Sequence, residues 1–439
     1  MTQSALLPEP DGDQHFALPP FVDTCLSNGL RVVTVHAPSV PMAEIRLAIP
    51  LPAHTVDPAA ASVLAAALGR CTARHTPEQM DDILGRRGAT LDVSWTGSQL
   101  TVNCSLPQQY LADLLALLSE VLTAPAYGGA AGRAAIRKVV GHVRARAAQP
   151  AAMARDALQR HCCPGLSTSG PPDEAAVTAM TAEQLSALHG KVVRPDGAYL
   201  VVVGSADPAA TAGAAASALE AWRPPPSPRS FAPPPPMTSA GLHVIDRPNA
   251  TQTHITLMAP AAARIDAVFP ALSIGNCVLG GFFSSRLFTR LREDTGLVYQ
   301  VESSIEDVLG RQVGFIESAT ATESAPRALG EISQALRRLC DDPPSAKEIH
   351  AAGTYMTGIT SIGQTSQAGM ASTLAGVIGY SLPLTWLADF PEQLRSVSPQ
   401  QVSDAVRRYY RPAAFSGVLV GQHGALGDDI RALWDESWK

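Results

Sequence analysis

The stretch "MTAEQLSALHGKVVRPDGAYLVVVG", residues Met180–Gly204, occurs twice in this chain in diverged form. The second copy, "VSPQQVSDAVRRYYRPAAFSGVLVG", spans Val397–Gly421. Matching positions keep one constant spacing over the whole stretch: Thr181 with Ser398, Gln184 with Gln401, Arg194-Pro195 with Arg411-Pro412 and Gly204 with Gly421. Chance does not maintain one spacing over so many positions, so the chain contains an internal duplication.

Both copies predict the same local structure. Thr181 and Ser398 are predicted helix N-caps, and a glutamine occupies the capping-box position three residues later. A helix, an Arg-Pro break and an apolar strand follow in each copy. The halves also open alike, because "AEIRLAIP" (Ala43–Pro50) and "THITLMAP" (Thr253–Pro260) both alternate like strands with one buried face.

Helical stretches separate these strands without strict alternation of strand and helix. They are predicted at 59–71, 77–87, 109–122 and 134–147 in the first half, and at 269–279, 284–292, 325–339 and 345–357 in the second. This order favours an α+β fold class in which one sheet-and-helix domain is made twice.

A proline-rich segment separates the two halves. "WRPPPSPRSFAPPPPM" (Trp222–Met237) is half proline, which is typical of an extended, semi-rigid connector. The predicted organisation is an N-terminal tail at 1–19, a first domain at 20–223, a linker at 224–240 and a second domain at 241–439.

Composition narrows the class of protein. The chain has 439 residues, of which 46% are hydrophobic and 16% charged, and a net charge of −6. These values predict a globular protein and argue against a nucleic-acid partner. No secretory signal or membrane span is visible, and the seven cysteines are scattered without a C-x-x-C motif. We therefore expect a cytoplasmic protein, and the GC-rich codons behind its abundant Ala, Pro, Gly and Arg suggest a bacterial one.

Four stretches carry a resemblance to a known family: "LSNGLRVVTVHAPSVPMAEIRLAIP" (Leu26–Pro50), "LDVSWTGSQLTVNCSLP" (Leu91–Pro107), "VIDRPNATQTHITLMAP" (Val244–Pro260) and "LGGFFSSRLFTRLREDTGLVY" (Leu279–Tyr299). The sequence resembles the pitrilysin/insulinase family of zinc peptidases, the inverzincins, over nearly its whole length. The resemblance implies two homologous halves, or two such chains, that close like a clamshell around a peptide.

The metal motif of that family is absent. Active members carry H-x-x-E-H on the first long helix, where the two histidines share one face and bind zinc, and the glutamate activates a water molecule. By comparison with the family, the motif falls on Ser62-Val63-Leu64-Ala65-Ala66. A further glutamate of the family falls near Gly141-His142, so His142 is the last of four degenerate positions, after Ser62, Ala65 and Ala66. We expect no zinc centre in this chain.

Other metal sites are poorly supported. No two histidines lie four residues apart, and His75 is followed by Glu78 and Gln79 where a second histidine would be needed. The cluster His161-Cys162-Cys163 is the one compact group of soft ligands, but adjacent residues point in different directions and no fourth ligand is evident. Its role stays open.

Arg292 and Tyr299 lie seven residues apart at a predicted junction of helix and strand. In the family that this chain resembles, such a pair comes from the half without zinc and reaches the zinc site of the other half. A guanidinium suits a peptide carbonyl or carboxylate, and a phenol can donate to an oxyanion. The alternative is a solvated helix-end cation beside a surface aromatic. Gly280 and Gly281 should allow close backbone approach, whereas Phe282 and Phe283 are predicted to be core.

A basic helix is the last feature. "RAAIRKVVGHVRARAAQ" (Arg133–Gln149) concentrates five cations, which indicates a solvated helix face or a surface for an acidic peptide.

The leading hypothesis is a non-catalytic, substrate-binding subunit of a heterodimeric zinc peptidase. Its partner would be a homologous chain with H-x-x-E-H, and zinc is expected in that partner. The peptide substrates could include leader segments of ribosomal natural products, which rests on the resemblance. Two alternatives remain: a structural or assembly protein with this fold, and an enzyme with a displaced metal or none.

Overall fold

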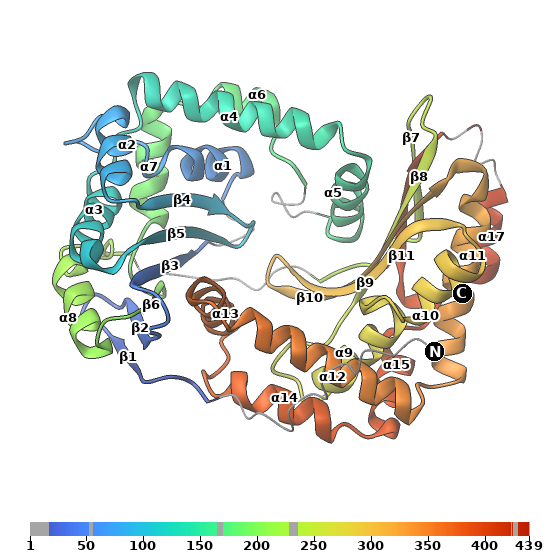
Figure 1. Ribbon diagram of the computed structural model, residues 1–439. Coiled ribbons are helices and arrows are strands. Elements are labelled where there is room, and N and C mark those ends of the chain that lie inside the picture. Colours follow the sequence, from blue (N-terminus) through green and yellow to red (C-terminus); the bar gives the residue numbers. More distant parts are fainter. Residues whose placement is uncertain are drawn as a thin grey trace, which may run out of the picture.

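The computed structural model describes residues 17–51, 56–164, 170–227, 236–422, 424 and 429–438. Most of the predicted tail at 1–19 and part of the predicted linker at 224–240 therefore lie outside the described residues. Strands and helices mix in two sheets, which confirms the predicted α+β class (Figure 1).

The first half supplies a six-stranded sheet and the helices around it. Its elements are β1 (Phe21–Cys25), β2 (Arg31–His36), β3 (Met42–Pro50), α1 (Pro58–Ala67), α2 (Pro77–Arg86), β4 (Thr90–Trp95), β5 (Gln99–Pro107), α3 (Leu111–Thr123), α4 (Gly129–Ala147), α5 (Pro150–Cys162), α6 (Glu174–Thr178), α7 (Ala182–Val192), β6 (Tyr199–Gly204) and α8 (Pro208–Leu219).

The second half supplies a five-stranded sheet. Its elements are β7 (Leu242–Asp246), β8 (Gln252–Pro260), α9 (Phe269–Asn276), the π-helical turn η2 (Cys277–Gly281), α10 (Arg286–Phe288), the π-helical turn η3 (Thr289–Asp294), β9 (Val298–Val308), β10 (Arg311–Ala321), α11 (Ala325–Asp341), α12 (Ala346–Gly363), α13 (Gln367–Gly379), α14 (Trp386–Ser396), α15 (Pro399–Tyr409), β11 (Ser416–Gly421) and α17 (Asp429–Ser437).

The two sheets repeat one topology. The first has the order β1-β2-β6-β3-β5-β4 and the second β7-β11-β8-β10-β9, so the two differ by the additional strand β1. In each sheet, the strand that comes last in the chain lies between a parallel and an antiparallel neighbour. β6 is parallel to β2 and antiparallel to β3, and β11 is parallel to β7 and antiparallel to β8. The duplicated stretch of the sequence ends on these equivalent strands, β6 and β11, which explains why it kept its spacing.

The halves exchange helices. Helix α5 of the first half packs on the second sheet, where Ala154 and Leu158 join Met258, Phe315 and Val418 in one hydrophobic cluster. Helix α13 of the second half packs in the same way on β3 and β6 of the first sheet. Figure 1 shows both helices beside the sheet of the opposite half. Each sheet therefore buries one face against its own half and the other against a borrowed helix.

Polar contacts strengthen one of these exchanges. Arg155 on α5 pairs with Glu306 at 2.7 Å and with Glu317 at 2.5 Å, and its guanidinium lies 4.5 Å from the centre of the Phe315 ring. The hydrogen bonds that Arg155 donates to Glu317 and Glu306 raise its pKa despite its partial burial. The two halves also touch at their hairpin tips, where Gly97 approaches Leu309.

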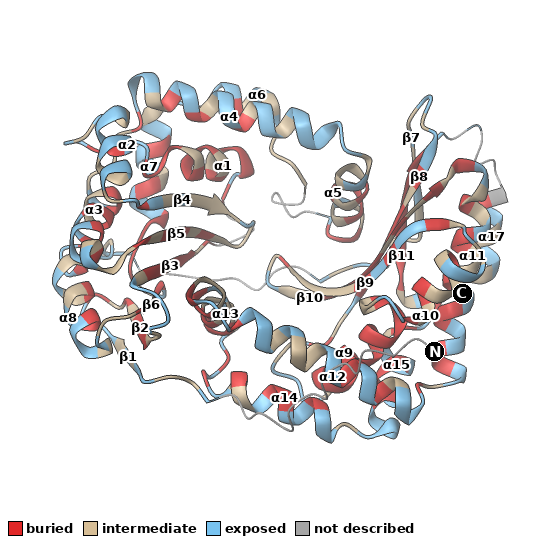
Figure 2. Ribbon diagram, in the orientation of Figure 1, coloured by how far each residue is buried: buried red, intermediate tan, exposed pale blue. Residues whose placement is uncertain are grey.

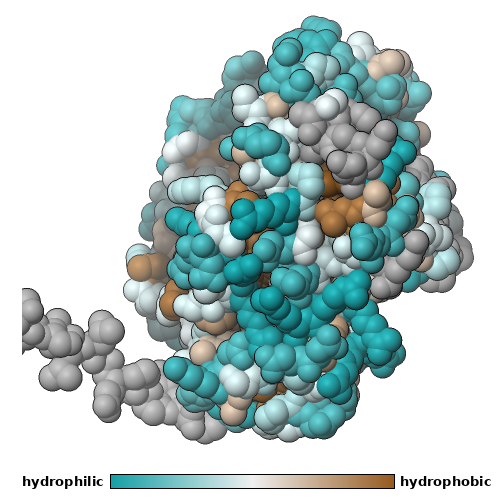
Figure 3. Space-filling view, turned by 90° about the vertical axis from the view of Figure 1, so that its right-hand side faces the viewer, coloured by the Kyte–Doolittle hydropathy of each residue, from teal (hydrophilic) through white to brown (hydrophobic). Residues whose placement is uncertain are grey.

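Burial follows the sheets, as Figure 2 shows. β6 and β11 are buried at every residue, while most of the long helices keep an exposed outer face. The face of the second half drawn in Figure 3 is mostly hydrophilic, with hydrophobic residues confined to small separate patches. Among the described residues, no helix combines the length and the apolar character needed to cross a bilayer.

The capping boxes predicted from the duplication are confirmed. Thr181 caps α7 through Gln184 and Ser398 caps α15 through Gln401, each with both reciprocal hydrogen bonds. Because each cap satisfies amides that the helix leaves free, we expect Thr181→Ala and Ser398→Ala each to lower the free energy of unfolding by about 1 kcal/mol. Urea denaturation measures this, and a loss confined to one copy would contradict the equivalence of the two caps.

Candidate functional site

The four degenerate metal positions meet in one cavity of about 800 Å³. Ser62, Ala65 and Ala66 of α1 and His142 of α4 all line it. α1 starts where the Asp57 side chain accepts a hydrogen bond from the Ala60 amide, and it packs directly against α4. The predicted positions are thus brought together in space, although they come from different helices.

The residues in this cavity do not fit a zinc ion. A serine hydroxyl and two alanine methyl groups replace the three residues of the motif, and His142 stands where the family has a carboxylate. Within the described ranges, no three His, Cys, Asp or Glu side chains gather closely enough to hold a metal ion. Nothing in the chemistry of these side chains can activate a water molecule as the family's motif does.

Basic side chains of α4 line the side of the cavity opposite the degenerate positions of α1. Lys138, His142 and Arg146 follow one another at four-residue intervals and therefore share one face of α4. Arg146 is neutralised by Asp156, with N–O distances of 2.6 and 2.9 Å. All five cations of the basic helix predicted from the sequence are exposed, but only two of them, Lys138 and Arg146, line the cavity.

The cluster His161-Cys162-Cys163 does not converge on a common point. His161 Nε2 lies 2.6 Å from the carbonyl oxygen of Ala240, and its ring packs against that of His243. Both cysteines are buried in the contact between the halves, and burial raises the pKa of Cys162 to about 11. These contacts give the cluster a packing role.

Arg292 and Tyr299 lie side by side on the second half. Arg292 belongs to the turn η3, and its guanidinium lies 4.8 Å from the centre of the Phe288 ring and 4.9 Å from that of Tyr299. Such contacts stabilise a cation by about 0.5–2 kcal/mol and fix its position without using its N–H donors. Tyr299 is the second residue of β9 and is 80% exposed.

The polar groups of this pair have no protein partner within the described parts of the chain. Neighbouring arginines do: Arg286 pairs with Glu348, and Arg290 pairs with Glu331. Among the residues that the structure describes, the Arg292 side chain has only its two ring contacts and the Tyr299 hydroxyl makes no hydrogen bond. Neither residue lines the cavity over Ser62 and His142. The pair therefore has five N–H donors and a phenol that no side chain or carbonyl of the described residues engages.

The backbone around the pair depends on a glycine. A Cβ on Gly280 would come within 2.8 Å of the Ser303 Cβ and backbone nitrogen, so only glycine lets η2 approach β9. Asn276 ties the same elements together, since its amide donates to the Ser303 carbonyl at 3.0 Å and its oxygen accepts from Tyr410 at 2.7 Å. The predicted close approach is confirmed at Gly280, whereas Gly281 has only ordinary contacts.

One prediction about neighbouring aromatics is wrong. Phe282 is partly buried against Tyr355, as expected of a core residue, but Phe283 is 74% exposed. The chain turns between η2 and α10 at this point, so the two adjacent side chains point to different sides. Phe283 packs edge-on against Phe288, 5.3 Å between ring centres, and so lies beside the ring that supports Arg292.

An ion pair fixes α12 against this region. Burial opposes ionisation of Glu348, but hydrogen bonds from Arg286 and Ser345 outweigh it and lower its pKa to about 2. A carboxylate whose folded pKa lies below its unfolded value stabilises the fold above the unfolded pKa of about 4.5 and loses this contribution as pH falls toward 2. We therefore expect Glu348→Gln to flatten the fall of stability between pH 4.5 and 2. Denaturation curves across this range test it, and an unchanged slope would contradict it.

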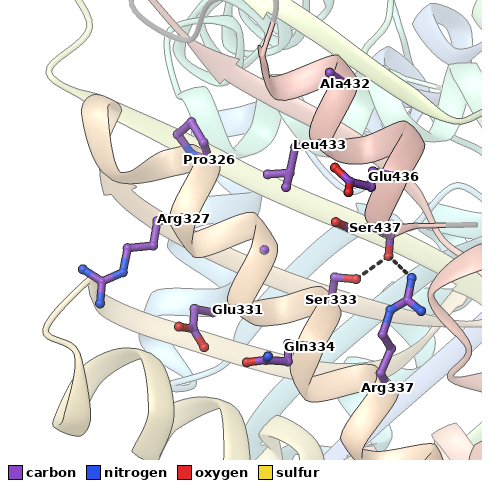
Figure 4. A pocket seen from close by; sticks show the side chains of 11 residues that line it. Pro326, Arg327, Glu331, Ser333, Gln334, Arg337, Ala432, Leu433, Glu436 and Ser437 are labelled. Carbon is purple, nitrogen blue, oxygen red and sulfur yellow. Dashed lines mark hydrogen bonds between the residues drawn. The ribbon is translucent and has the colours of Figure 1, made fainter.

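A second cavity, of about 740 Å³, lies between α11 and α17 (Figure 4). Ser333 and Arg337 both donate to the carbonyl oxygen of Ser437, at 2.5 and 2.8 Å. These bonds satisfy the end of α17 and dock it on α11. The close-up shows Arg327 and Glu331 directed away from that carbonyl, so the polar groups do not converge on one point.

Comparison with known proteins bears on this geometry. Residues 179–354 match the family described as "Peptidase M16 inactive domain". The chain carries a peptidase M16 inactive domain. The matched part of this M16 chain includes the strands β6 to β10 and both Arg292 and Tyr299. The match confirms, for this part of the chain, the resemblance to the pitrilysin family predicted from the sequence, and the matched family is described as inactive.

Two solved structures share the fold of this M16 chain. One is a peptidase M16 inactive domain from Pseudomonas fluorescens, with 22% identity, a TM-score of 0.84 and coverage of 92% of this chain and 98% of that one. The other is described as a protease from Helicobacter pylori, with 16% identity, a TM-score of 0.83 and coverage of 92% and 100%. At these identities the likeness shows the fold. No curated protein matches the sequence.

Proposed function

We propose that this M16 chain is the non-catalytic, peptide-binding subunit of a two-chain zinc peptidase. One observation carries the proposal: Arg292 and Tyr299 are held together with their polar groups unpaired among the described residues, and away from the chain's own degenerate cavity. A cation and a phenol placed in this way suit a site that another chain completes.

The roles of the pair follow from their chemistry. The guanidinium of Arg292 orients the peptide by donating hydrogen bonds from its fixed fork of N–H groups to carbonyl or carboxylate oxygens of the peptide. The Tyr299 hydroxyl donates to the oxyanion that develops on the scissile carbonyl. The homologous partner with H-x-x-E-H would hold the zinc, which supplies Lewis-acid chemistry there. Leader segments of ribosomal peptides are one class of substrate.

A reconstitution experiment tests the proposal. A homologous chain with intact H-x-x-E-H, encoded beside this one, is purified and assayed with zinc and a labelled peptide, with and without this M16 chain. We expect cleavage to require both chains. Equal cleavage by the homologous chain alone would contradict the proposal.

A structural or assembly role is the second candidate. The exchanged helices α5 and α13 and the four hydrophobic clusters make a rigid body, which suits a scaffold. A scaffold has no use for an unpaired Arg292 beside Tyr299. If Arg292→Ala and Tyr299→Phe both leave the reconstituted cleavage unchanged, while cleavage still requires the presence of this chain, a scaffold is the correct function.

A further inference from the structure

Helix α12 exposes an apolar face where a charged one is expected. Tyr355, Ile359 and Ile362 are 38%, 51% and 71% exposed, and their spacing of four and three residues places them on one side of the helix. Together with Phe283 they form a surface that we name the apolar strip. Most of the large hydrophobic side chains that are exposed among the described residues belong to this strip or to Tyr299 beside it.

The apolar strip is continuous with the Arg292–Tyr299 pair. Phe282 packs on Tyr355 of α12, with ring centres 5.4 Å apart, which joins the helix to the turn before α10. Phe283, next along the chain, packs on Phe288, and Phe288 supports Arg292. The link from Tyr355 to Arg292 therefore consists of two sets of ring contacts joined by the peptide bond between Phe282 and Phe283. Ile359 and Ile362 continue the strip along α12.

The strip also lacks charge. Between Glu348 and Asp389 the sequence contains no Asp, Glu, Lys or Arg. Helix α4 holds the equivalent place in the first half, since each of these helices follows the long helix after a β-hairpin and packs on the first helix of its half. α4 carries five cations, whereas α12 beyond His350 exposes mainly apolar and hydroxyl side chains. An uncharged face of this kind fits an uncharged, apolar ligand.

We infer that the apolar strip binds an apolar, uncharged segment of the peptide that Arg292 and Tyr299 hold. This inference rests on the proposed function and names its substrate class. Tyr355 to Ile362 spans about 10 Å along the helix axis, at 1.5 Å per residue. An extended peptide advances about 3.3 Å per residue, so the helical part of the strip accommodates about three residues of it.

The size of the strip favours a peptide over a whole protein surface. A stable interface between two chains takes roughly 20–30 residues on each side, whereas the strip consists of four large side chains. The position of the strip supports the same ligand. A peptide oriented at Arg292 continues onto the adjoining surface, and Phe283 of the strip packs on Phe288, the ring that supports Arg292.

Two synthetic decapeptides test the inference on the isolated full chain. They share length, charge and fluorescent label, and one has leucine at alternate positions where the other has serine. We expect fluorescence anisotropy to show that the leucine peptide binds at least about tenfold more tightly, and that the double variant Ile359→Thr/Ile362→Thr removes this preference. Threonine keeps the branched Cβ of isoleucine and therefore its helix propensity.

Ile265 provides the matched control, because it is 72% exposed on the same half but outside the strip. Ile265→Thr should keep the full preference for leucine. Equal binding of the two peptides to the unmodified chain, or an unchanged preference in the double variant, would overturn the inference. So would a double variant that still prefers leucine but no longer assembles with the homologous chain, since the strip would then be a contact between chains.

The same assay separates the inference from the proposed function. Peptide binding by the isolated chain requires neither a partner nor cleavage, so a lost preference in the double variant reports on the strip alone. An Arg292→Ala variant that leaves reconstituted cleavage unchanged contradicts the proposed function and says nothing about the preference for leucine.

Discussion

Replacing Tyr299 by phenylalanine is expected to lower the kcat of the reconstituted two-chain peptidase about a hundredfold. The substitution removes one hydroxyl that makes no hydrogen bond within the described chain, at a residue that is 80% exposed, so the fold should be unaffected. Loss of one donor to a developing oxyanion raises the barrier by about 3 kcal/mol. Single-turnover kinetics with a labelled peptide, at saturating concentrations of both chains, measure the effect on the chemical step.

A second arginine–tyrosine pair supplies the control. Arg408 lies 5.1 Å from the ring centre of Tyr409, at the end of α15 and far along the chain from the site. Tyr409→Phe removes the same hydroxyl from the same kind of contact and should leave kcat unchanged. Arg292→Lys should not restore the activity lost in Arg292→Ala, because an ammonium lacks the planar fork of donors. An unchanged kcat in Tyr299→Phe would remove the proposed role.

The largest expected loss of stability follows from Phe315→Ala. Phe315 is fully buried between β10 and α5, beneath the guanidinium of Arg155. Removing its ring leaves a cavity in the cluster that joins the halves, which typically costs about 3–5 kcal/mol. Equilibrium denaturation by urea, followed by circular dichroism, measures the change in the free energy of unfolding.

Phe283→Ala is the companion variant. It makes the same chemical change at a side chain that is 74% exposed, so the free energy of unfolding should change by no more than about 0.5 kcal/mol. A loss below 1 kcal/mol in Phe315→Ala would show that α5 contributes little to holding the halves together.

Local signals predicted much of the fold. The alternation in Ala43–Pro50 and Thr253–Pro260 placed β3 and β8 within a residue, and the capping boxes placed the starts of α7 and α15. These features depend on neighbours a few residues apart, which is why they can be read from the chain. The duplication then predicted that the same domain is made twice, and the two sheets have the same strand order apart from β1.

The exchange of α5 and α13 was not predicted, because it depends on which surface an apolar helix covers. A helix such as Gln367–Gly379 shows an apolar face in the sequence, but nothing local states that this face lies on β3 and β6 rather than on its own sheet. The exposure of Phe283 was missed for the same reason. Its neighbour Phe282 has the same chemistry, and only the turn between η2 and α10 separates their environments.

Some parts of the candidate site were predicted from the sequence and others were not. Family resemblance placed Ser62, Ala65, Ala66 and His142 together, and the structure brings them to one cavity. The seven-residue spacing of Arg292 and Tyr299 did not predict that the two side chains touch. Their contact depends on the path of η3 and on the support from Phe288, which the spacing does not show. The absence of charged residues between Glu348 and Asp389 was visible in the sequence, but it acquires meaning only when α12 is known to be exposed there.

The traded helices restrict how this molecule can move. Moving one half away from the other would separate α5 from the second sheet or α13 from the first, and either step exposes a largely apolar surface to water. Each chain should therefore behave as one rigid body. In the proposed two-chain peptidase, a substrate would then enter by a movement of one chain relative to the other, and not by a hinge between the halves of this chain.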